Sequence, residues 1–350
     1  MTSAPFRLSV LDQSPVSEGS SGSQALQNTI DLARLADRLG YHRYWVAEHH
    51  GGPMLAGPSP EVLIGPIAAA TSHIRVGSGG VMLPHYSPFK VAESFSLLSG
   101  LFPGRIDLAL GRAAGTDPLT TFALQRDRRQ ASPDDFPQQL IELLGYLDDR
   151  LPADHPFARL AKTLPGRPER PQPWLLGSSQ QSAIWAAELG LPYAFADFIN
   201  PKGAEITALY RERFAEHEGV GGSAGEGAGA GAKPRVAVGV WVICAETDEE
   251  AQRLAASGRM TFTLLRRGQL IAVPPPERAV EFLAADERSS APGQPRSQRR
   301  AIVGAPATVR AELEDVVAKY KAEEAIVLSI TYAHEARRRS YELLAEVFGL

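Results

Sequence analysis

Cysteine is nearly absent from this sequence: Cys244 is the only one among 350 residues. No disulfide can therefore form within the chain, and a metal site built from several thiolates is excluded. A large excess of either charge is also missing, because 36 Lys and Arg face 40 Asp and Glu, for a net charge of −4. That balance gives no reason to expect nucleic acid or an anionic membrane as a partner.

Long apolar runs are missing as well. No stretch approaches the ~20 apolar residues that a membrane helix needs. The first residues, MTSAPFRLSVLDQSP, lack the basic and then apolar pattern of a secretory signal. With 44% hydrophobic and 22% charged residues, the composition is that of a globular protein with a substantial core. We therefore expect a protein of the reducing cytoplasm.

Strand-like segments alternate with helix-like segments along most of the chain. The predicted strands cover residues 7–11, 41–48, 74–83, 105–111, 173–177, 193–196, 235–244 and 324–330. The predicted helices cover residues 24–40, 59–72, 87–100, 179–189, 201–217, 248–266 and 306–320. Such alternation implies a parallel sheet covered by helices. About eight units favour a (β/α)8 TIM barrel with insertions over an open sheet, and we expect residues 1–350 to form this one domain.

Three segments interrupt the alternation. Residues 219–233 are rich in Gly and Ala, and residues 287–300 are polar, so both are predicted to be flexible surface loops. Residues 113–170 are rich in Pro and Arg and are predicted to cross the barrel mouth, as an ordered lid or as a disordered segment. Nearby aromatic side chains would line an apolar pocket or simply pack: Phe102, Phe122 and Phe136.

Three titratable residues, Glu48, His49 and His50, follow the second predicted strand. Catalytic groups of barrel enzymes lie at the carboxyl ends of strands, so these residues are candidates for proton transfer. Because side chains alternate along a strand, Glu48 and His50 should point one way and His49 the other. This weakens a metal site, since adjacent histidines seldom converge on one ion. A purely structural role for all three stays open.

Two other strand ends carry candidate ligand-binding residues. The glycine-rich stretch GSGG at residues 77–80 closes the third strand, which indicates either close approach of a flat ligand or a bulge. Arg112 follows the fourth strand and could bind a phosphate or carboxylate. After the fifth strand, Gly177 turns the chain, and Ser178 and Ser179 precede a helix whose amino end would favour a phosphate. Simple helix capping by a serine is the alternative.

These stretches together resemble the bacterial luciferase-like flavin-dependent monooxygenases. The resemblance is carried, in family order, by YHRYWVAEHH, IRVGSGGVMLPHYSPFKVAESF, LFPGRIDLALGRAAGTD and WLLGSSQQSAIWAAELGLPYAFA. It implies a (β/α)8 barrel, commonly a homodimer, that binds reduced FMN or the deazaflavin F420. For the monooxygenases it also implies a separate NAD(P)H-dependent flavin reductase, and oxidation of a small organic substrate by O2 through a C4a-peroxyflavin.

The resemblance also assigns roles to individual residues. His49 matches the catalytic histidine, with Glu48 and His50 as supporting groups. Gly79 and Gly80 match a place where the family can carry a non-proline cis peptide against the flavin ring. Arg112, Ser178 and Ser179 match the family's phosphate-binding positions, and Gly177 forms the turn before the two serines.

One departure from the family pattern is visible. The light-emitting enzymes carry a reactive cysteine at the position that Gly111 fills here, so light emission is not expected. Within the fold, an F420-dependent hydride-transfer enzyme is the alternative to an FMN-dependent monooxygenase. A non-catalytic flavin-binding protein and a metal-dependent hydrolase are further alternatives, and no substrate is predicted.

Overall fold

A computed structural model describes residues 6–112, 117–125, 128–129, 135–200, 202–219, 233–289 and 301–350. Most of the two predicted flexible loops, residues 220–232 and 290–300, lies outside these ranges. No helix in the described part of the chain is both long and apolar enough to cross a membrane.

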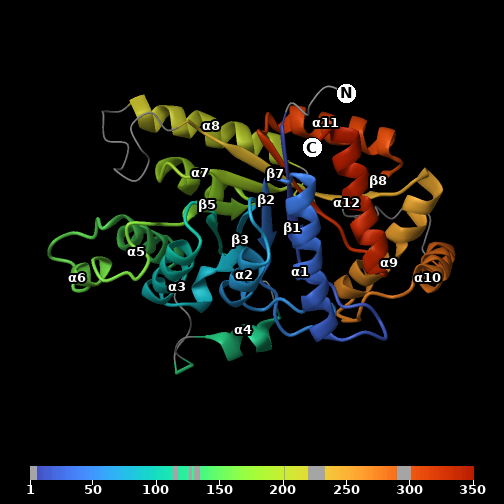
Figure 1. Ribbon diagram of the computed structural model, residues 1–350, viewed down its shortest axis with the longest axis horizontal. Coiled ribbons are helices and arrows are strands. Elements are labelled where there is room, and N and C mark those ends of the chain that lie inside the picture. Colours follow the sequence, from blue (N-terminus) through green and yellow to red (C-terminus); the bar gives the residue numbers. More distant parts are fainter. Residues whose placement is uncertain are drawn as a thin grey trace.

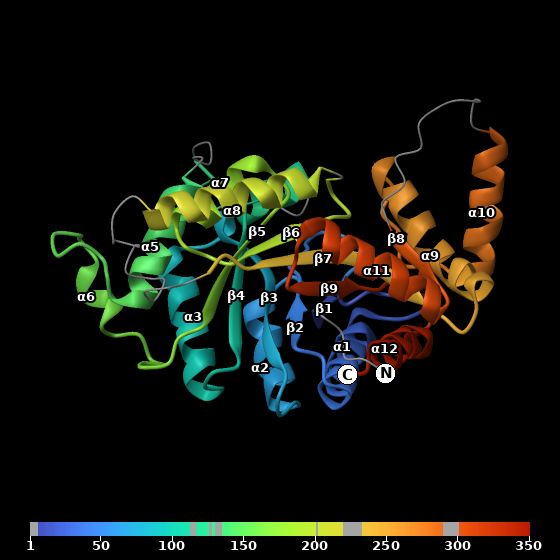
Figure 2. The same ribbon diagram turned by 90° about the horizontal axis from the view of Figure 1, so that it is seen from above.

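Eight parallel strands close into a barrel surrounded by helices (Figures 1 and 2), which confirms the predicted (β/α)8 fold. The barrel strands are β1 (Arg7–Asp12), β2 (Arg43–Val46), β3 (Arg75–Met82), β4 (Ile106–Gly111), β5 (Gln172–Gly177), β6 (Tyr193–Ala196), β7 (Val236–Cys244) and β9 (Glu324–Leu328). Consecutive strands pair from β1 to β7, and β9 closes the ring by pairing with β7 on one side and β1 on the other.

A short strand that the sequence analysis missed, β8 (Ala301–Gly304), lies outside the ring. Strand β7 is nine residues long, and its pairing with β9 ends at Trp241, opposite Leu328. From Trp241 to Cys244, β7 pairs with β8 instead. The region between β7 and β9 therefore adds a strand and extra helices beside the barrel.

The helices of the described residues are α1 (Gly22–Leu39), α2 (Pro60–Ala69), the 3-10 helix η1 (Leu83–His85), α3 (Pro88–Leu101), α4 (Pro118–Leu124), α5 (Phe136–Asp148), α6 (Ala158–Ala161), α7 (Gln180–Glu188), α8 (Gly203–Gly219), α9 (Asp248–Arg266), α10 (Pro276–Ser289), α11 (Pro306–Tyr320) and α12 (His334–Phe348). The seven predicted helices correspond to α1, α2, α3, α7, α8, α9 and α11, and the other helices of the described residues were not predicted. Helix α1 shows why these boundaries are encoded locally. The Ser21 hydroxyl accepts a hydrogen bond from the Gln24 N–H, and Gly40 ends the helix at φ 88°.

The segment predicted to cross the mouth mostly lies on the outer side of the barrel. Helix α5 packs against α3 (Figure 1), and Leu140 and Leu143 on its inner side are completely buried, whereas Ile141 is 58% exposed. The prediction of one long mouth-crossing segment is therefore wrong for α5. Helix α4 does lie near the mouth, because Thr120 contacts the loop after β2 at Gly51.

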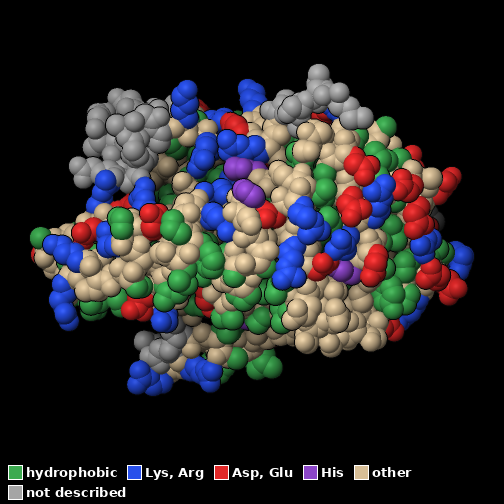
Figure 3. Space-filling model, viewed as in Figure 1, with side chains coloured by type: hydrophobic (Ala, Val, Ile, Leu, Met, Phe, Trp, Pro, Cys, Tyr) green, Lys and Arg blue, Asp and Glu red, His purple; other side chains and the backbone are tan. Residues whose placement is uncertain are grey.

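The amino ends of the strands enclose a buried ionic network. The Arg43 guanidinium donates to the carboxylates of Asp107 and Glu324, each at 2.5 Å, and Arg75 lies 2.6 Å from Asp107. Arg43 is 2% exposed, and its guanidinium lies 4.7 Å from the centre of the Trp174 ring. This end of the barrel is thus filled by paired charges and aromatic rings. On the outer surface, basic and acidic side chains are interspersed on the face shown in Figure 3.

Candidate active site

A cavity of about 450 Å³ opens at the carboxyl ends of the barrel strands, where the sequence analysis placed the active site. Its volume lies within the range of about 300–1,000 Å³ typical of small-molecule sites. It is lined by Leu11, Gln13, Trp45, Ala47, His49, Gly79, Met82, Gly111, Arg112, Leu176, Gly177, Ser178, Ser179, Ala194, Phe195, Ala196, Phe198, Ile199, Gly239 and Ile326. The wall is mainly apolar, with a few polar groups at particular positions.

The cavity receives His49 but neither of its neighbours. His49 lines the cavity, and its backbone N–H donates to the Gly57 carbonyl at 3.1 Å, which fixes the chain after β2. Glu48 is fully buried on the other side of that chain. Its carboxylate accepts hydrogen bonds from His50 Nε2 at 2.8 Å and from the Met82 N–H at 2.9 Å. Strand β2 already ends at Val46, before these residues, and the three separate into one cavity residue and a hydrogen-bonded pair.

The Glu48–His50 pair belongs to a polar cluster outside the cavity. The His50 and His85 rings meet edge to face at 5.9 Å between centroids. Burial, together with the nearby charge of Glu48, raises the pKa of the Glu61 carboxyl and that of the Tyr86 hydroxyl. Glu48 also ties the end of β2 to the end of β3 through Met82, so the cluster holds in place the segment that carries His49.

The predicted phosphate-binding residues come together in the same cavity. Arg112, Gly177, Ser178 and Ser179 all line it, beside the amino end of α7. Ser179 is the N-cap of α7, and its hydroxyl accepts from the Ser182 N–H at 3.3 Å. The capping role is therefore present in the structure. The helix end, with its free N–H groups and positive dipole end, lies beside the cavity as well.

Two glycines permit close packing at this wall. A Cβ on Gly177 would lie 2.1 Å from the Ser182 hydroxyl oxygen, and one on Gly80 would lie 2.4 Å from Leu176 Cδ1. The Gly79–Gly80 peptide bond is cis, as the resemblance implied. The pairing of β3 with β4 also shifts between Gly79 and Val81. The bulge that was the alternative explanation of these glycines is therefore present too.

The sequence analysis missed one polar residue of the cavity, Gln13. It directly follows β1 and is 8% exposed, and its Oε1 is buried without a hydrogen-bond partner in the described part of the chain. The same signal that selected Glu48, a polar residue directly after a strand, could have found it. The aromatic wall consists of Trp45, Phe195 and Phe198. None of the three phenylalanines suggested for a pocket lines this cavity.

Metal binding receives no support from the described residues. Within them, no group of three or more His, Cys, Asp or Glu side chains is placed to hold a metal ion. Cys244 is buried, and burial raises the pKa of its thiol to about 12, so the thiol is protonated at neutral pH.

Residues 6–323 match the model of the luciferase-like monooxygenase family. The chain belongs to this family. It is 46% identical to the uncharacterised protein YwcH of Bacillus subtilis (strain 168), over 98% of this chain and 99% of that protein. It is 38% identical to the N-acetyl-S-alkylcysteine monooxygenase of the same organism, over 97% of this chain and 98% of the relative.

Solved structures agree with this family membership. The crystal structure of apo-MsnO8 superimposes with a TM-score of 0.85 at 43% identity, covering 99% of this chain and 98% of that one. More distant structures share the fold alone. They include the oxygenating constituent of 3,6-diketocamphane monooxygenase in complex with FMN (TM-score 0.70, 20% identity) and an F420-dependent secondary alcohol dehydrogenase (TM-score 0.64, 13% identity). Family members and structural neighbours thus support an oxidoreductase, and the neighbours include one solved with FMN and one solved with an F420 adduct.

Proposed function

We propose that this protein is an FMN-dependent monooxygenase that uses reduced FMN and O2 to oxidise a small organic substrate. The observation that carries the proposal is the set of polar side chains that line the cavity at the carboxyl ends of the barrel strands. Arg112 and the amino end of α7 suit an anionic group, whereas His49 and Gln13 suit the polar edge of a ring. Most of the other lining side chains are apolar, as binding of a flat mononucleotide requires.

The described residues fit FMN by their chemistry. Arg112, Ser178 and Ser179 would hold its phosphate through charge and hydrogen bonds. The amide of Gln13 has a buried oxygen that no described residue satisfies, so it would bind a donor on the ring or on the substrate. When bound, reduced FMN supplies the electrons for oxygen activation, and the protein supplies orientation and exclusion of water.

His49 would act as the proton-transfer residue at this cavity. An imidazole exchanges protons near neutral pH, which suits a group that must give and take a proton in one turnover. Glu48 and His50 would act through position, since they fix the chain around His49 from outside the cavity. The apolar side chains of Leu11, Trp45 and Ile326 would keep water from the reacting atoms.

Three partners complete the proposal. A separate NAD(P)H-dependent reductase in the cytoplasm would supply the reduced flavin. A second copy of the chain would form a homodimer, and exposed apolar residues on α2 and α3 suit such an interface: Val62 is 70% exposed and Leu101 63%. N-acetyl-S-alkylcysteines are the first substrates to test, because a relative at 38% identity is named for them.

The deciding experiment is anaerobic titration of the purified protein with reduced FMN and, separately, with reduced F420. We expect tight binding of FMN and rapid consumption of O2 once it is admitted. Replacing Ser178 and Ser179 by alanine should weaken FMN binding about tenfold or more, because charge-assisted hydrogen bonds are lost. Ser94→Ala, on the exposed side of α3, should leave binding unchanged.

Binding of F420 alone, without oxygen consumption, would replace the proposal by hydride transfer. Flavin binding without turnover of any substrate would favour a binding protein. An unchanged dissociation constant in the double serine variant would remove the phosphate site from the proposal.

A further inference from the structure

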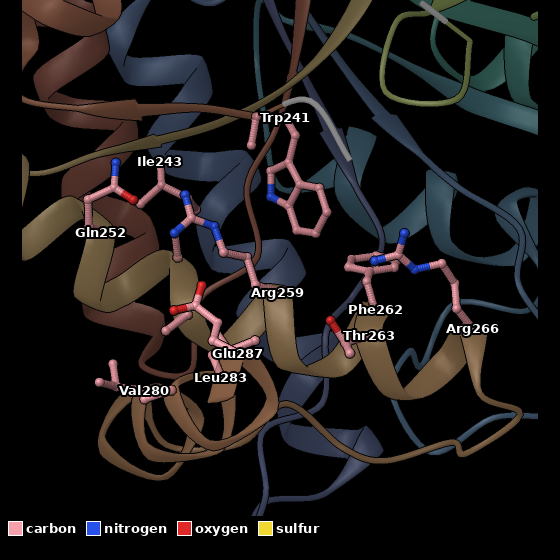
Figure 4. A pocket seen from close by; sticks show the side chains of 14 residues that line it. Trp241, Ile243, Gln252, Arg259, Phe262, Thr263, Arg266, Val280, Leu283 and Glu287 are labelled. Carbon is pink, nitrogen blue, oxygen red and sulfur yellow. The ribbon is translucent and has the colours of Figure 1, made fainter. Parts of the chain in front are cut away.

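A second cavity, of about 310 Å³, lies beside the barrel between β7, α9, α10 and β8 (Figure 4). Its volume is at the lower end of the range for small-molecule sites. It is lined by Trp241, Ile243, Gln252, Ala255, Ala256, Arg259, Phe262, Thr263, Arg266, Val280, Leu283, Ala284, Glu287 and Ala301. None of these residues lines the barrel cavity, so this is a separate compartment created by the region inserted between β7 and β9.

Two aromatic side chains form the wall that faces the barrel. Trp241 and Phe262 meet edge to face with their ring centroids 4.5 Å apart, and they are 5% and 8% exposed. They belong to a buried cluster that also contacts Leu11 and Phe198, which line the barrel cavity. Helix α9 comes this close because position 258 is a glycine, whose Cβ would lie 2.8 Å from Trp241 Cζ2. An occupant would therefore lie one layer of side chains away from the barrel cavity.

Arg259 is a charged residue of this cavity that has no hydrogen-bonding or ion-pair partner among the described residues. It lies on α9 and is partly buried, and no acceptor in the described part of the chain forms a hydrogen bond or ion pair with it. Burial lowers the pKa of its guanidinium. On the same helix, Arg253 lies 2.7 Å from Glu250 and 2.5 Å from Glu277. A half-buried guanidinium without an acceptor is unfavourable unless a ligand supplies one.

The rest of the lining restricts the ligand. Figure 4 shows the Arg259 side chain reaching toward Ile243 and Gln252, with the Trp241 ring facing the same space. The two other charged residues of the lining are Arg266 and Glu287, and both are exposed to solvent. The deeper wall is apolar and aromatic. A guanidinium pairs best with a planar carboxylate, through two parallel hydrogen bonds.

We propose that the cavity between α9 and α10 binds an organic carboxylate with an apolar body. Arg259 holds the carboxylate, and Trp241 and Phe262 pack against the body. Binding at this site requires no flavin, so the proposal can be tested independently of the function proposed for the barrel cavity.

The test uses octanoate as the probe, with the full-length protein in calorimetric titration. We expect saturable binding of octanoate and at least tenfold weaker binding of 1-octanol, which has the same chain without the charge. Arg259→Gln should weaken octanoate binding about tenfold to hundredfold, the range for a charge-assisted hydrogen bond to a carboxylate. Arg259→Lys should restore part of the loss, and Arg253→Gln is the matched control on the same helix.

Location is tested separately, because Trp241 reports on the cavity. Octanoate should change the tryptophan fluorescence of the wild type, and Trp241→Phe should abolish most of that change while calorimetry still detects binding. The proposal is overturned if octanoate fails to bind, if octanol binds equally well, or if folded Arg259→Gln binds octanoate like the wild type. Reduced FMN should bind Arg259→Gln and wild type alike, so failure of the barrel-site proposal would be seen independently.

Discussion

At the amino end of the barrel strands, Arg43 is buried between the carboxylates of Asp107 and Glu324, whereas at the carboxyl end Arg112 lines a cavity of about 450 Å³. The two arginines sit on the same scaffold and carry the same charge. At the first end the charge is neutralised by the protein itself, and the space is filled with aromatic rings. At the second end the space is open, and the polar groups face it. The comparison indicates that one end maintains the fold and the other is available for ligands.

The largest effect should follow from breaking the amino-end network. Arg43→Met leaves two buried carboxylates without their shared cation, which costs about 3–5 kcal/mol of unfolding free energy. Arg112→Met at the other end should cost less, because Arg112 lines an open cavity and is not enclosed between two buried carboxylates. Urea unfolding of both variants measures the difference. Equal losses of stability would show that the two ends do not differ in the way we describe.

His49→Ala should separate catalysis from stability at the carboxyl end. Loss of a general acid–base group lowers turnover by about 100-fold or more, while FMN binding and the unfolding free energy should change little. His50→Ala is the informative partner, because it removes a donor to the buried Glu48 and should lower stability more than turnover. Turnover of N-acetyl-S-alkylcysteines or another confirmed substrate provides the assay. Wild-type turnover in His49→Ala would refute its role.

His42, next to Arg43, should make the amino end sensitive to acid. Burial and the neighbouring Arg43 charge lower the pKa of His42 to about 4. Since its ordinary pKa is 6.5, the folded state binds fewer protons than the unfolded state between about pH 6.5 and 4, and stability falls as the pH falls through that window. His42→Gln should reduce this loss by on the order of 1 kcal/mol, allowing for partial exposure.

The measurement for His42 is urea unfolding at several pH values. The control is His73→Gln, which replaces a histidine whose side chain is 90% exposed. A pH dependence that is identical in His42→Gln and wild type would contradict the prediction.

The smallest effect is expected at Glu61, in the polar cluster around Glu48. Burial, and then the nearby Glu48 charge, raise the pKa of Glu61 above its ordinary 4.5. The folded state therefore binds more protons, and stability falls as the pH rises from about 4.5 through the raised value. Glu61→Gln should stabilise the protein at neutral pH by a few tenths of a kcal/mol, about the size of a partly exposed electrostatic effect. Thermal unfolding at pH 7 and at pH 4 checks this, and a gain that is larger at pH 4 would have the wrong sign.

Local signals predicted the repeated strand and helix units well, because each depends on neighbours in the chain. Helices α2 and α3 begin within one residue of their predicted starts at Ser59 and Ser87. Strand β8 was missed because four residues carry little periodic signal, and its identity depends on pairing with the overhanging end of β7. Helix α5 was missed because it lies within a segment rich in Pro and Arg, and only packing against α3 shows that it belongs to the barrel's outer layer.

The candidate site, like the fold, was predicted in part from the sequence. A polar residue directly after a barrel strand pointed to His49, and Glu48 and His50 lie outside the cavity, as alternation had predicted, although β2 ends at Val46 before all three. That reasoning did not show what the pair contacts, since Met82 lies 34 residues away from Glu48 in the sequence. Their direct part in catalysis stays a prediction.

By itself, the sequence determined the order of the barrel strands and the polar residues at their ends, because strand and helix periodicity and capping act over a few neighbouring residues. It also carried the family resemblance. The tertiary structure alone decided which of those residues share a cavity. It brought Gln13, His49, Arg112 and Ser179 to one cavity, and it built the compartment around Arg259 from a region inserted between two barrel strands. Both outcomes depend on closure of the ring and on packing between distant segments, which no local pattern encodes.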